Sequence, residues 1–220
     1  MRTVKVKICG ITRQEDLQTA VALGVDALGF VVGVPTSPRN LSQKQAEKLI
    51  NQVPLFVTSV LVMVPKSLDA ILQTCKCLRP NAVQLHGNIQ IDTIKLRTTL
   101  SNVSLIRAID TRSVTLTEGA SNATKAFDAV LLDSFAKGMS GGTGLVHDWN
   151  LSKRVKRTIH PTPLILAGGL TPENVQEAIH TVQPYAVDVS TGVESHPGIK
   201  DPTKILTFIR NVKEVNVYDQ

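Results

Sequence analysis

The chain has 220 residues, of which 42% are hydrophobic, a content that excludes a disordered chain, and its 14 glycines and 11 prolines exclude a collagen-like one. Its longest apolar stretches fall far short of the ~20 residues that cross a bilayer. The N-terminus also lacks the apolar block of a secretory signal, so we expect a soluble, cytoplasmic protein with no membrane contact. Lys and Arg outnumber Asp and Glu by 24 to 18, which suits nucleic acid or a small anionic substrate.

Local patterns narrow the choice of partner. The densest basic cluster, at residues 153–157, has no interleaved aromatic residues and is typical of a solvated helix face, so we predict no nucleic-acid partner. The three cysteines, Cys9, Cys75 and Cys77, are too few and too unevenly spaced for a disulfide framework or a zinc site. We therefore expect a reducing compartment and no metal. Cys75 lies on an apolar helical stripe and should be buried, whereas Cys77 falls off that stripe.

Apolar, β-branched runs alternate with amphipathic segments along the whole chain, and each run begins about 20 to 30 residues after the last. The expected strands, in chain order, cover residues 4–9, 27–32, 55–64, 82–86, 103–109, 127–133, 163–167 and 185–190. The expected helices between and after them cover residues 15–23, 43–51, 68–78, 89–100, 114–125, 149–159, 172–181 and 202–212.

Strict alternation of strands and helices predicts parallel strands joined by crossover helices. Eight such units average about 27 residues each, near the lower end for a (β/α)8 barrel of typically about 250 residues. An open doubly wound sheet is the alternative, but its Gly-rich first turn is missing at residues 9–12. No linker divides the chain, so we predict an α/β protein with a single TIM-barrel domain over residues 1–220 and a mobile loop at residues 134–148.

In such a barrel the chemistry lies at the C-terminal ends of the strands, and several of these ends are polar here. Cys9 ends the first expected strand and points inward, where Lys7 on the same face would favour its thiolate; the alternative is a thiol that only fills space. Gln84 and His86 point inward at the fourth strand end, and this histidine could equally be a structural hydrogen-bonding group. Asp133, which ends the sixth strand, could cap a loop or act as a general acid.

Two Gly-bearing turns follow the seventh and eighth strands, at residues 167–172 and 188–193. Glycines let backbone N–H groups approach an anion closely, and these two turns form the usual phosphate site of such barrels. A pair of tight connections is the alternative. The expected phosphate-binding residues are Gly168, Gly169, Ser190, Thr191 and Gly192. Arg39, presented by Pro38 after the second strand, is either ordinary surface or a bidentate partner for a carboxylate or phosphate.

Appearing together and in order, these segments resemble the phosphoribosylanthranilate isomerase family over essentially the whole chain. The resemblance is carried by KICGIT at 7–12, LGF at 28–30, SPR at 37–39, VQLHG at 83–87, DS at 133–134, GGTG at 141–144, LAGGL at 166–170 and DVSTGVE at 188–194. It implies a (β/α)8 barrel and a cofactor-free reaction of tryptophan biosynthesis. That reaction is the Amadori rearrangement of N-(5-phosphoribosyl)anthranilate, a small phosphosugar, to 1-(2-carboxyphenylamino)-1-deoxyribulose 5-phosphate.

The resemblance also implies roles for single residues. Cys9 corresponds to the family's general base and Asp133 to its general acid. Arg39 corresponds to the partner of the anthranilate carboxylate, and Asp188 and His86 to groups that orient the sugar, while Gln84 is expected to bind substrate beside His86.

Two positions depart from the family pattern. His147 stands where the family usually carries Phe, a change that bears on how the loop packs. Thr191 stands where Ser is common, and this change keeps the hydroxyl group.

Three other functions are weighed against this one. The related histidine-pathway isomerase has aspartate at the position of Cys9 and would need a second phosphate site, of which the turns at 64–66 and 86–88 show no sign. A class I aldolase would need a lysine at the end of a central strand. A non-catalytic phosphate-binding barrel would have no use for both Cys9 and Asp133. The sequence leaves the oligomeric state open between a monomer and a homodimer.

Overall fold

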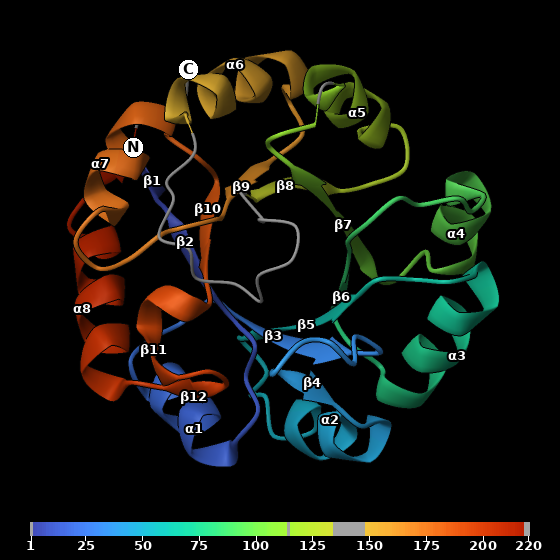
Figure 1. Cartoon of the computed structure of the whole chain (residues 1–220), viewed down its shortest axis with the longest axis horizontal. Coiled ribbons are helices and arrows are strands. Elements are labelled where there is room, and N and C mark those ends of the chain that lie inside the picture. The colour runs from blue at the N-terminus through green and yellow to red at the C-terminus, as the bar shows by residue number, and fades with distance from the viewer. Residues whose placement is uncertain (1, 114, 134–147, 218–220) are drawn as a thin grey trace.

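A computed structural model describes residues 2–113, 115–133 and 148–217 of the chain. Within these residues, eight parallel strands close into a barrel that eight α-helices surround (Figure 1). This confirms the predicted (β/α)8 architecture. No helix among the described residues is long and apolar enough to cross a bilayer.

The barrel strands are β2 (Lys5–Cys9), β3 (Ala27–Val32), β5 (Thr58–Met63), β6 (Ala82–Leu85), β7 (Ser104–Asp110), β8 (Ala129–Asp133), β9 (Leu164–Leu166) and β10 (Ala186–Val189). The helices are α1 (Gln14–Ala22), α2 (Gln43–Ile50), α3 (Leu68–Leu78), α4 (Thr93–Thr99), α5 (Leu116–Ala123), α6 (Trp149–Ile159), α7 (Val175–Val182) and α8 (Pro202–Lys213). Shorter elements are β1 (Arg2–Thr3), β4 (Asn40–Leu41), the 3-10 turn η1 (Thr191–Val193), β11 (Glu194–His196), β12 (Ile199–Lys200) and β13 (Asn216–Val217).

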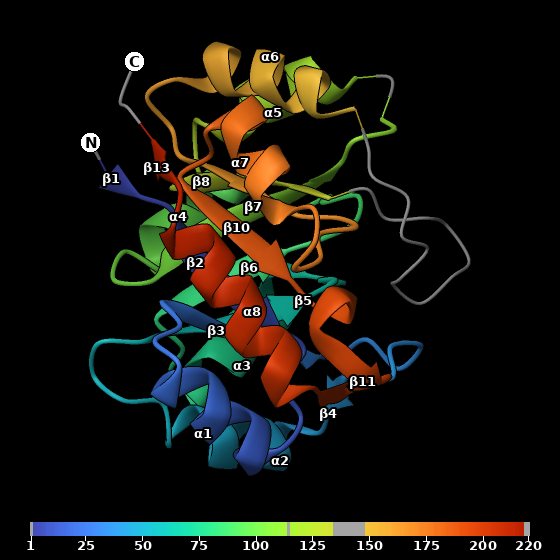
Figure 2. The same cartoon turned by 90° about the vertical axis from the view of Figure 1, so that its left-hand side faces the viewer.

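The ring of strands runs β2-β10-β9-β8-β7-β6-β5-β3, and the pairing of β2 with β3 closes it. Every pairing around the ring is parallel, so all eight carboxyl ends lie at one end of the barrel. β4 adds a short ninth strand beside β3. The antiparallel β1–β13 pair lies at the opposite end of the barrel from β11 (Figure 2).

The strands are apolar on both faces because each face has its own core. In β5, Val60 and Val62 belong to the cluster inside the barrel, whereas Leu61 and Met63 belong to the layer between strands and helices. This alternation follows from the two-residue period of a strand, and it explains why such strands appear as nearly continuous apolar runs.

Three of the expected elements begin three or more residues later than predicted. The strand expected at 55–64 begins at Thr58, because Leu55 and Phe56 lie in a turn and are 89% and 94% exposed. The helix expected at 89–100 begins at Thr93, where the side chain of Asp92 accepts a hydrogen bond from the Lys95 N–H. The helix expected at 172–181 begins at Val175, since residues 172–174 form a turn.

The loop expected at residues 134–148 falls almost wholly on residues 134–147, which lie outside the described part of the chain. The GGTG motif at 141–144 and the departure at His147 lie there too.

Candidate active site

The predicted catalytic residues both end barrel strands. Cys9 is the last residue of β2, and Asp133 is the last residue of β8. Only β10 and β9 separate these two strands around the ring. His86 directly follows β6, and Asp188 lies near the end of β10. The fold therefore brings these four residues to one rim of the barrel, as expected for the carboxyl ends of parallel strands.

Cys9 lies beside Gly29, its register partner on β3. A Cβ atom at Gly29 would lie 2.9 Å from Cys9 Sγ and 3.0 Å from Lys7 Nζ. The missing side chain thus leaves room for the thiol and for the ammonium group inside the barrel.

Burial raises the pKa of the Cys9 thiol above its ordinary value. Lys7 opposes this rise, Asp188 adds to it, and Lys200 lowers the pKa again, but burial outweighs the two cations. Lys7 therefore lowers the pKa of Cys9, as predicted, but by less than burial raises it. At neutral pH the thiol form prevails, and the thiolate is the minor form.

Lys7 itself is held in the barrel interior by an ion pair. Its Nζ lies 2.9 Å from Asp188 Oδ1, and the two side chains are only 3% and 7% exposed. Burial opposes the charge of Lys7, yet Asp188 and the Cys9 sulfur raise its pKa. The barrel therefore keeps a cation directly below the thiol.

Gln84 and His86 interact with each other. Their Nε2 atoms lie 2.6 Å apart, so the histidine ring nitrogen accepts from the amide. Burial lowers the pKa of His86 to about 4, and the charges of Lys7 and Arg107 add to this shift. The ring is therefore neutral at pH 7. Gln84 Oε1 is buried and has no hydrogen-bond partner among the described residues.

Arg39 is buried against Glu194, a residue for which no role was predicted. Arg39 Nε donates to Glu194 Oε1 at 2.7 Å, and Nη2 donates to Oε2 at 2.5 Å. Arg39 Nη2 also lies 3.4 Å from Thr191 Oγ1. A Cβ atom on Gly10, whose φ is 77°, would lie 2.3 Å from Arg39 Cδ. Arg39 therefore packs directly across the residue that follows Cys9.

The two predicted phosphate turns pack against each other. Gly168 and Gly169 follow β9 with φ angles of 84° and 67°, conformations that favour glycine. A Cβ atom on Gly192, in the turn after β10, would lie 2.0 Å from the carbonyl oxygen of Leu170. Neither Gly168 N–H nor Gly169 N–H donates to another described residue. These turns leave N–H groups available to an anion.

Ser190, between Asp188 and the turn, makes a contact that was not predicted. Its hydroxyl donates to the Cys9 carbonyl oxygen at 3.1 Å, which ties the end of β10 to the end of β2. The expected contact of this side chain with phosphate stays a prediction.

Lys200 is a second buried residue that the sequence analysis missed. Its side chain is 0% exposed, and its Nζ donates to Cys9 O at 2.6 Å, to Ser190 O at 3.1 Å and to Glu194 Oε1 at 2.9 Å. Burial lowers the pKa of Lys200, and Glu194 opposes that shift. Although burial alone would raise the pKa of Glu194, its hydrogen bonds with Arg39 and Lys200 lower it, so Glu194 is an anion between two cations.

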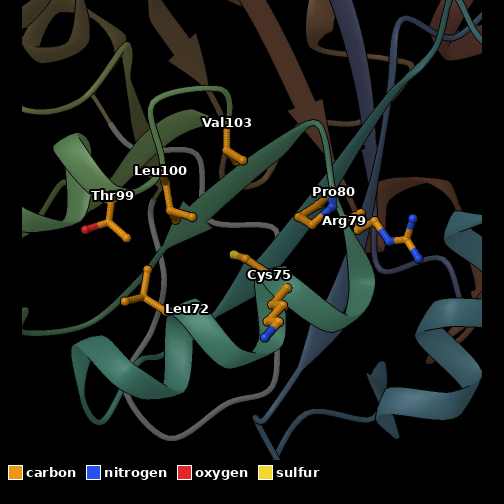
Figure 3. A pocket seen from close by; sticks show the side chains of 8 residues that line it. Leu72, Cys75, Arg79, Pro80, Thr99, Leu100 and Val103 are labelled. Atoms are coloured by element: carbon orange, nitrogen blue, oxygen red, sulfur yellow. The ribbon is translucent and has the colours of Figure 1, made fainter.

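A separate hollow of about 420 Å³ lies on the outside of the barrel between α3 and α4 (Figure 3). Its lining includes Leu72, Cys75, Pro80, Leu100 and Val103, and it is almost wholly apolar. Pro80 precedes β6 and Val103 precedes β7, so the hollow lies near the amino ends of the strands, away from Cys9. It is no part of the strand-end site. Cys75, which lines this hollow, is buried as predicted, and Cys77 is exposed.

Across the described ranges, no three His, Cys, Asp or Glu side chains cluster as a metal site would require.

Comparison with known proteins agrees with this geometry. Residues 6–211 match the family model described as N-(5'phosphoribosyl)anthranilate (PRA) isomerase. The chain is 42% identical over 212 residues to the N-(5'-phosphoribosyl)anthranilate isomerase of Methanothrix thermoacetophila, and the match covers 95% of this chain and 98% of the relative.

Solved structures agree as well. The crystal structure of the Thermotoga maritima phosphoribosyl anthranilate isomerase superimposes with a TM-score of 0.84 at 39% identity, covering 96% of this chain and all 100% of that one. A structure of the isomerase in complex with reduced 1-(o-carboxyphenylamino)-1-deoxyribulose 5-phosphate gives a TM-score of 0.81 at 39% identity, with the same coverage. The chain belongs to the N-(5'-phosphoribosyl)anthranilate isomerase family.

Proposed function

We propose that this protein catalyses the Amadori rearrangement of N-(5'-phosphoribosyl)anthranilate to 1-(2-carboxyphenylamino)-1-deoxyribulose 5-phosphate in the cytoplasm, as a step of tryptophan biosynthesis. The observation that carries the proposal is the position of Cys9 and Asp133 at the ends of β2 and β8, on the rim that also holds the two glycine turns. The relatives that match nearly the full length of the chain are named for this activity.

Asp133 is the general acid of the proposed reaction. It gives a proton to the furanose ring oxygen, and the bond between that oxygen and C1 breaks while the anthranilate nitrogen forms a C1=N double bond. The result is a protonated Schiff base with an open sugar chain.

Cys9, in its minor thiolate form, is the general base. It removes the proton from C2, and the electron pair moves into the C1–C2 bond and neutralises the iminium nitrogen, which gives an enolamine. The enolamine then takes a proton at C1 and loses its C2 hydroxyl proton to become the ketone. C2 is oxidised and C1 is reduced within one molecule, so the sequence of steps needs no cofactor.

The remaining residues bind and orient the substrate in this proposal. The glycine N–H groups of the two turns, together with Ser190 and Thr191, hold the phosphate. Arg39 binds the anthranilate carboxylate through Nη1, the guanidinium nitrogen that donates to no described residue. The neutral His86, with Gln84 and Asp188, orients the sugar hydroxyls.

The direct test follows the loss of substrate fluorescence with the purified protein. We expect Cys9→Ser and Asp133→Asn each to lower kcat by about a hundredfold to ten-thousandfold, the usual contribution of a general acid or base. Cys77→Ser removes an exposed thiol instead and is the matched control, which should keep wild-type turnover. The proposal is wrong if the wild type shows no turnover, or if either site variant keeps near-full activity. The histidine-pathway substrate, assayed in parallel, should not turn over.

We also propose that the protein works as a monomer or a homodimer. A Thermotoga maritima relative, 37% identical, is described as dimeric. Light scattering distinguishes the two states.

A further inference from the structure

The buried ammonium group of Lys200 has a complete set of partners. An ammonium carries three hydrogens, and three oxygen atoms surround it within 3.1 Å: the carbonyls of Cys9 and Ser190 and one carboxylate oxygen of Glu194. A buried charge is tolerated in a protein only when it is paired and hydrogen-bonded in this way. These partners belong to the end of β2, the turn after β10 and the start of β11, so one side chain joins three segments of the rim.

The contact with Glu194 extends this influence to Arg39. Glu194 Oε1 accepts from Lys200 Nζ at 2.9 Å and also from Arg39 Nε at 2.7 Å. A displacement of the ammonium would therefore move the carboxylate that holds the guanidinium. Because the aliphatic Cγ and Cδ atoms of Arg39 pack over Gly10, the same displacement would be felt at Cys9 and at the residue that follows it.

The backbone of Lys200 is fixed as well. Its N–H donates to Asp16 Oδ2 at 3.1 Å, and that carboxylate also pairs with Arg13 at the start of α1. β12 pairs with β11 through the Lys200–Glu194 register. The side chain therefore extends from an anchored strand to its three acceptors.

We propose that Lys200 is a positioning residue for the isomerase reaction: it holds the Cys9 end of β2 and, through Glu194, the guanidinium of Arg39 at a fixed spacing. This inference rests on the proposed function only in assigning the base to Cys9. Lys200 also lowers the pKa of the Cys9 thiol by its charge, so it promotes the thiolate as well as holding its backbone.

The test compares Lys200→Met and Lys200→Gln with the wild type. Methionine removes the charge and all three donors, whereas glutamine removes the charge and one donor and keeps two N–H donors on a shorter side chain. Lys204→Met is the matched control, because exposed Lys204 donates at 2.9 Å to the backbone carbonyl of Glu194 and not to the carboxylate that holds Arg39. For each protein we measure kcat, KM, and the pH dependence of Cys9 alkylation by iodoacetamide, resolved by peptide mass spectrometry.

We expect Lys200→Met to lower kcat/KM by about a hundredfold, the loss typical of a small misplacement of reacting groups, with KM raised and kcat reduced. The alkylation midpoint of Cys9 should move to higher pH in both Lys200 variants, and Lys200→Gln should recover part of kcat. Lys204→Met should match the wild type in all three measurements.

A purely structural role for Lys200 predicts another result. Loss of folded protein would lower the apparent kcat in proportion to the folded fraction and leave KM and the alkylation midpoint unchanged; that result in either variant overturns the proposal. The alkylation measurement needs no substrate, so it tests Lys200 even if the wild type fails to isomerise phosphoribosylanthranilate, a failure that would count against the proposed function alone.

Discussion

Cys9 is subject to opposing influences that the sequence could only partly predict. Strand parity placed Lys7 on the same inward face, and the structure adds Asp188 and Lys200 around the same thiol. Burial outweighs both cations and raises the pKa of Cys9, so the reactive thiolate is the minor form at neutral pH. The activity should therefore increase with pH until the thiol has titrated.

Replacement of Lys7 should shift the pKa of Cys9 in a definite direction. The charge of Lys7 acts on the thiol more strongly than the opposite charge of Asp188, so Lys7→Met should raise the pKa of Cys9 and move the rising limb of kcat/KM to higher pH. The measurement is the pH profile of kcat/KM, which reports groups of the free enzyme. An unchanged limb would contradict the coupling.

Lys5→Met is the matched control for this variant. Lys5 lies on the same strand, but its ammonium is half exposed and pairs with Asp26 at 2.8 Å instead of with Asp188. Its removal should leave the rising limb where it is. Cys9 alkylation against pH gives a second readout if Lys7→Met loses activity by leaving Asp188 unpaired.

At the scale of whole elements, the sequence predicted all eight strands and helices, but several of their ends were wrong. The spacing of hydrophobic residues identifies a helix or strand. The residue at which a helix begins is set by a local hydrogen bond, which that spacing does not reveal. In α4 that bond is the one from the Lys95 N–H to Asp92 Oδ1, 2.8 Å long. The residues before Asp92 therefore stay outside the helix although their apolar pattern continues.

Asp92→Ala should lower the free energy of unfolding by about 1 kcal/mol, because it removes the acceptor for an otherwise unpaired N–H group at the start of α4. Urea denaturation measures this loss. Asp92→Asn keeps the side-chain oxygen and should lose much less stability. Equal losses in the two variants would mean that the negative charge, and not the cap, fixes the start of the helix.

For the whole molecule, the strand-end positions of Cys9 and Asp133 could be predicted because parallel strands share one active rim. The Lys200–Glu194–Arg39 cluster could not, because Arg39 lies 155 residues from Glu194 in sequence and only the closed barrel brings these two together. Glu194 and Lys200 are 6 residues apart and meet in the short β11–β12 pair, which was not predicted. The available signal was indirect: Glu194 and Lys200 flank the short segment after the eighth strand, where charged residues would ordinarily be solvent-exposed.

The pairing of β1 with β13 has a consequence for the order of the chain. Arg2 is the register partner of Val217, so the first and last strands of the described chain lie side by side. A short glycine linker could join them, and new termini could open in the exposed turn between Leu55 and Phe56. We expect this circular permutant to fold and to isomerise the substrate at a rate near that of the wild type, by the same fluorescence assay.

A second permutant, opened between Ser190 and Thr191, should also fold but lose turnover, since the break falls in the phosphate turn. If the first permutant failed to fold, the order in which the eight units follow one another along the chain would matter for folding, although β1 and β13 lie side by side. Each of the eight strand–helix units packs against its two neighbours in the ring, so we expect the barrel to fold whichever unit comes first in the chain.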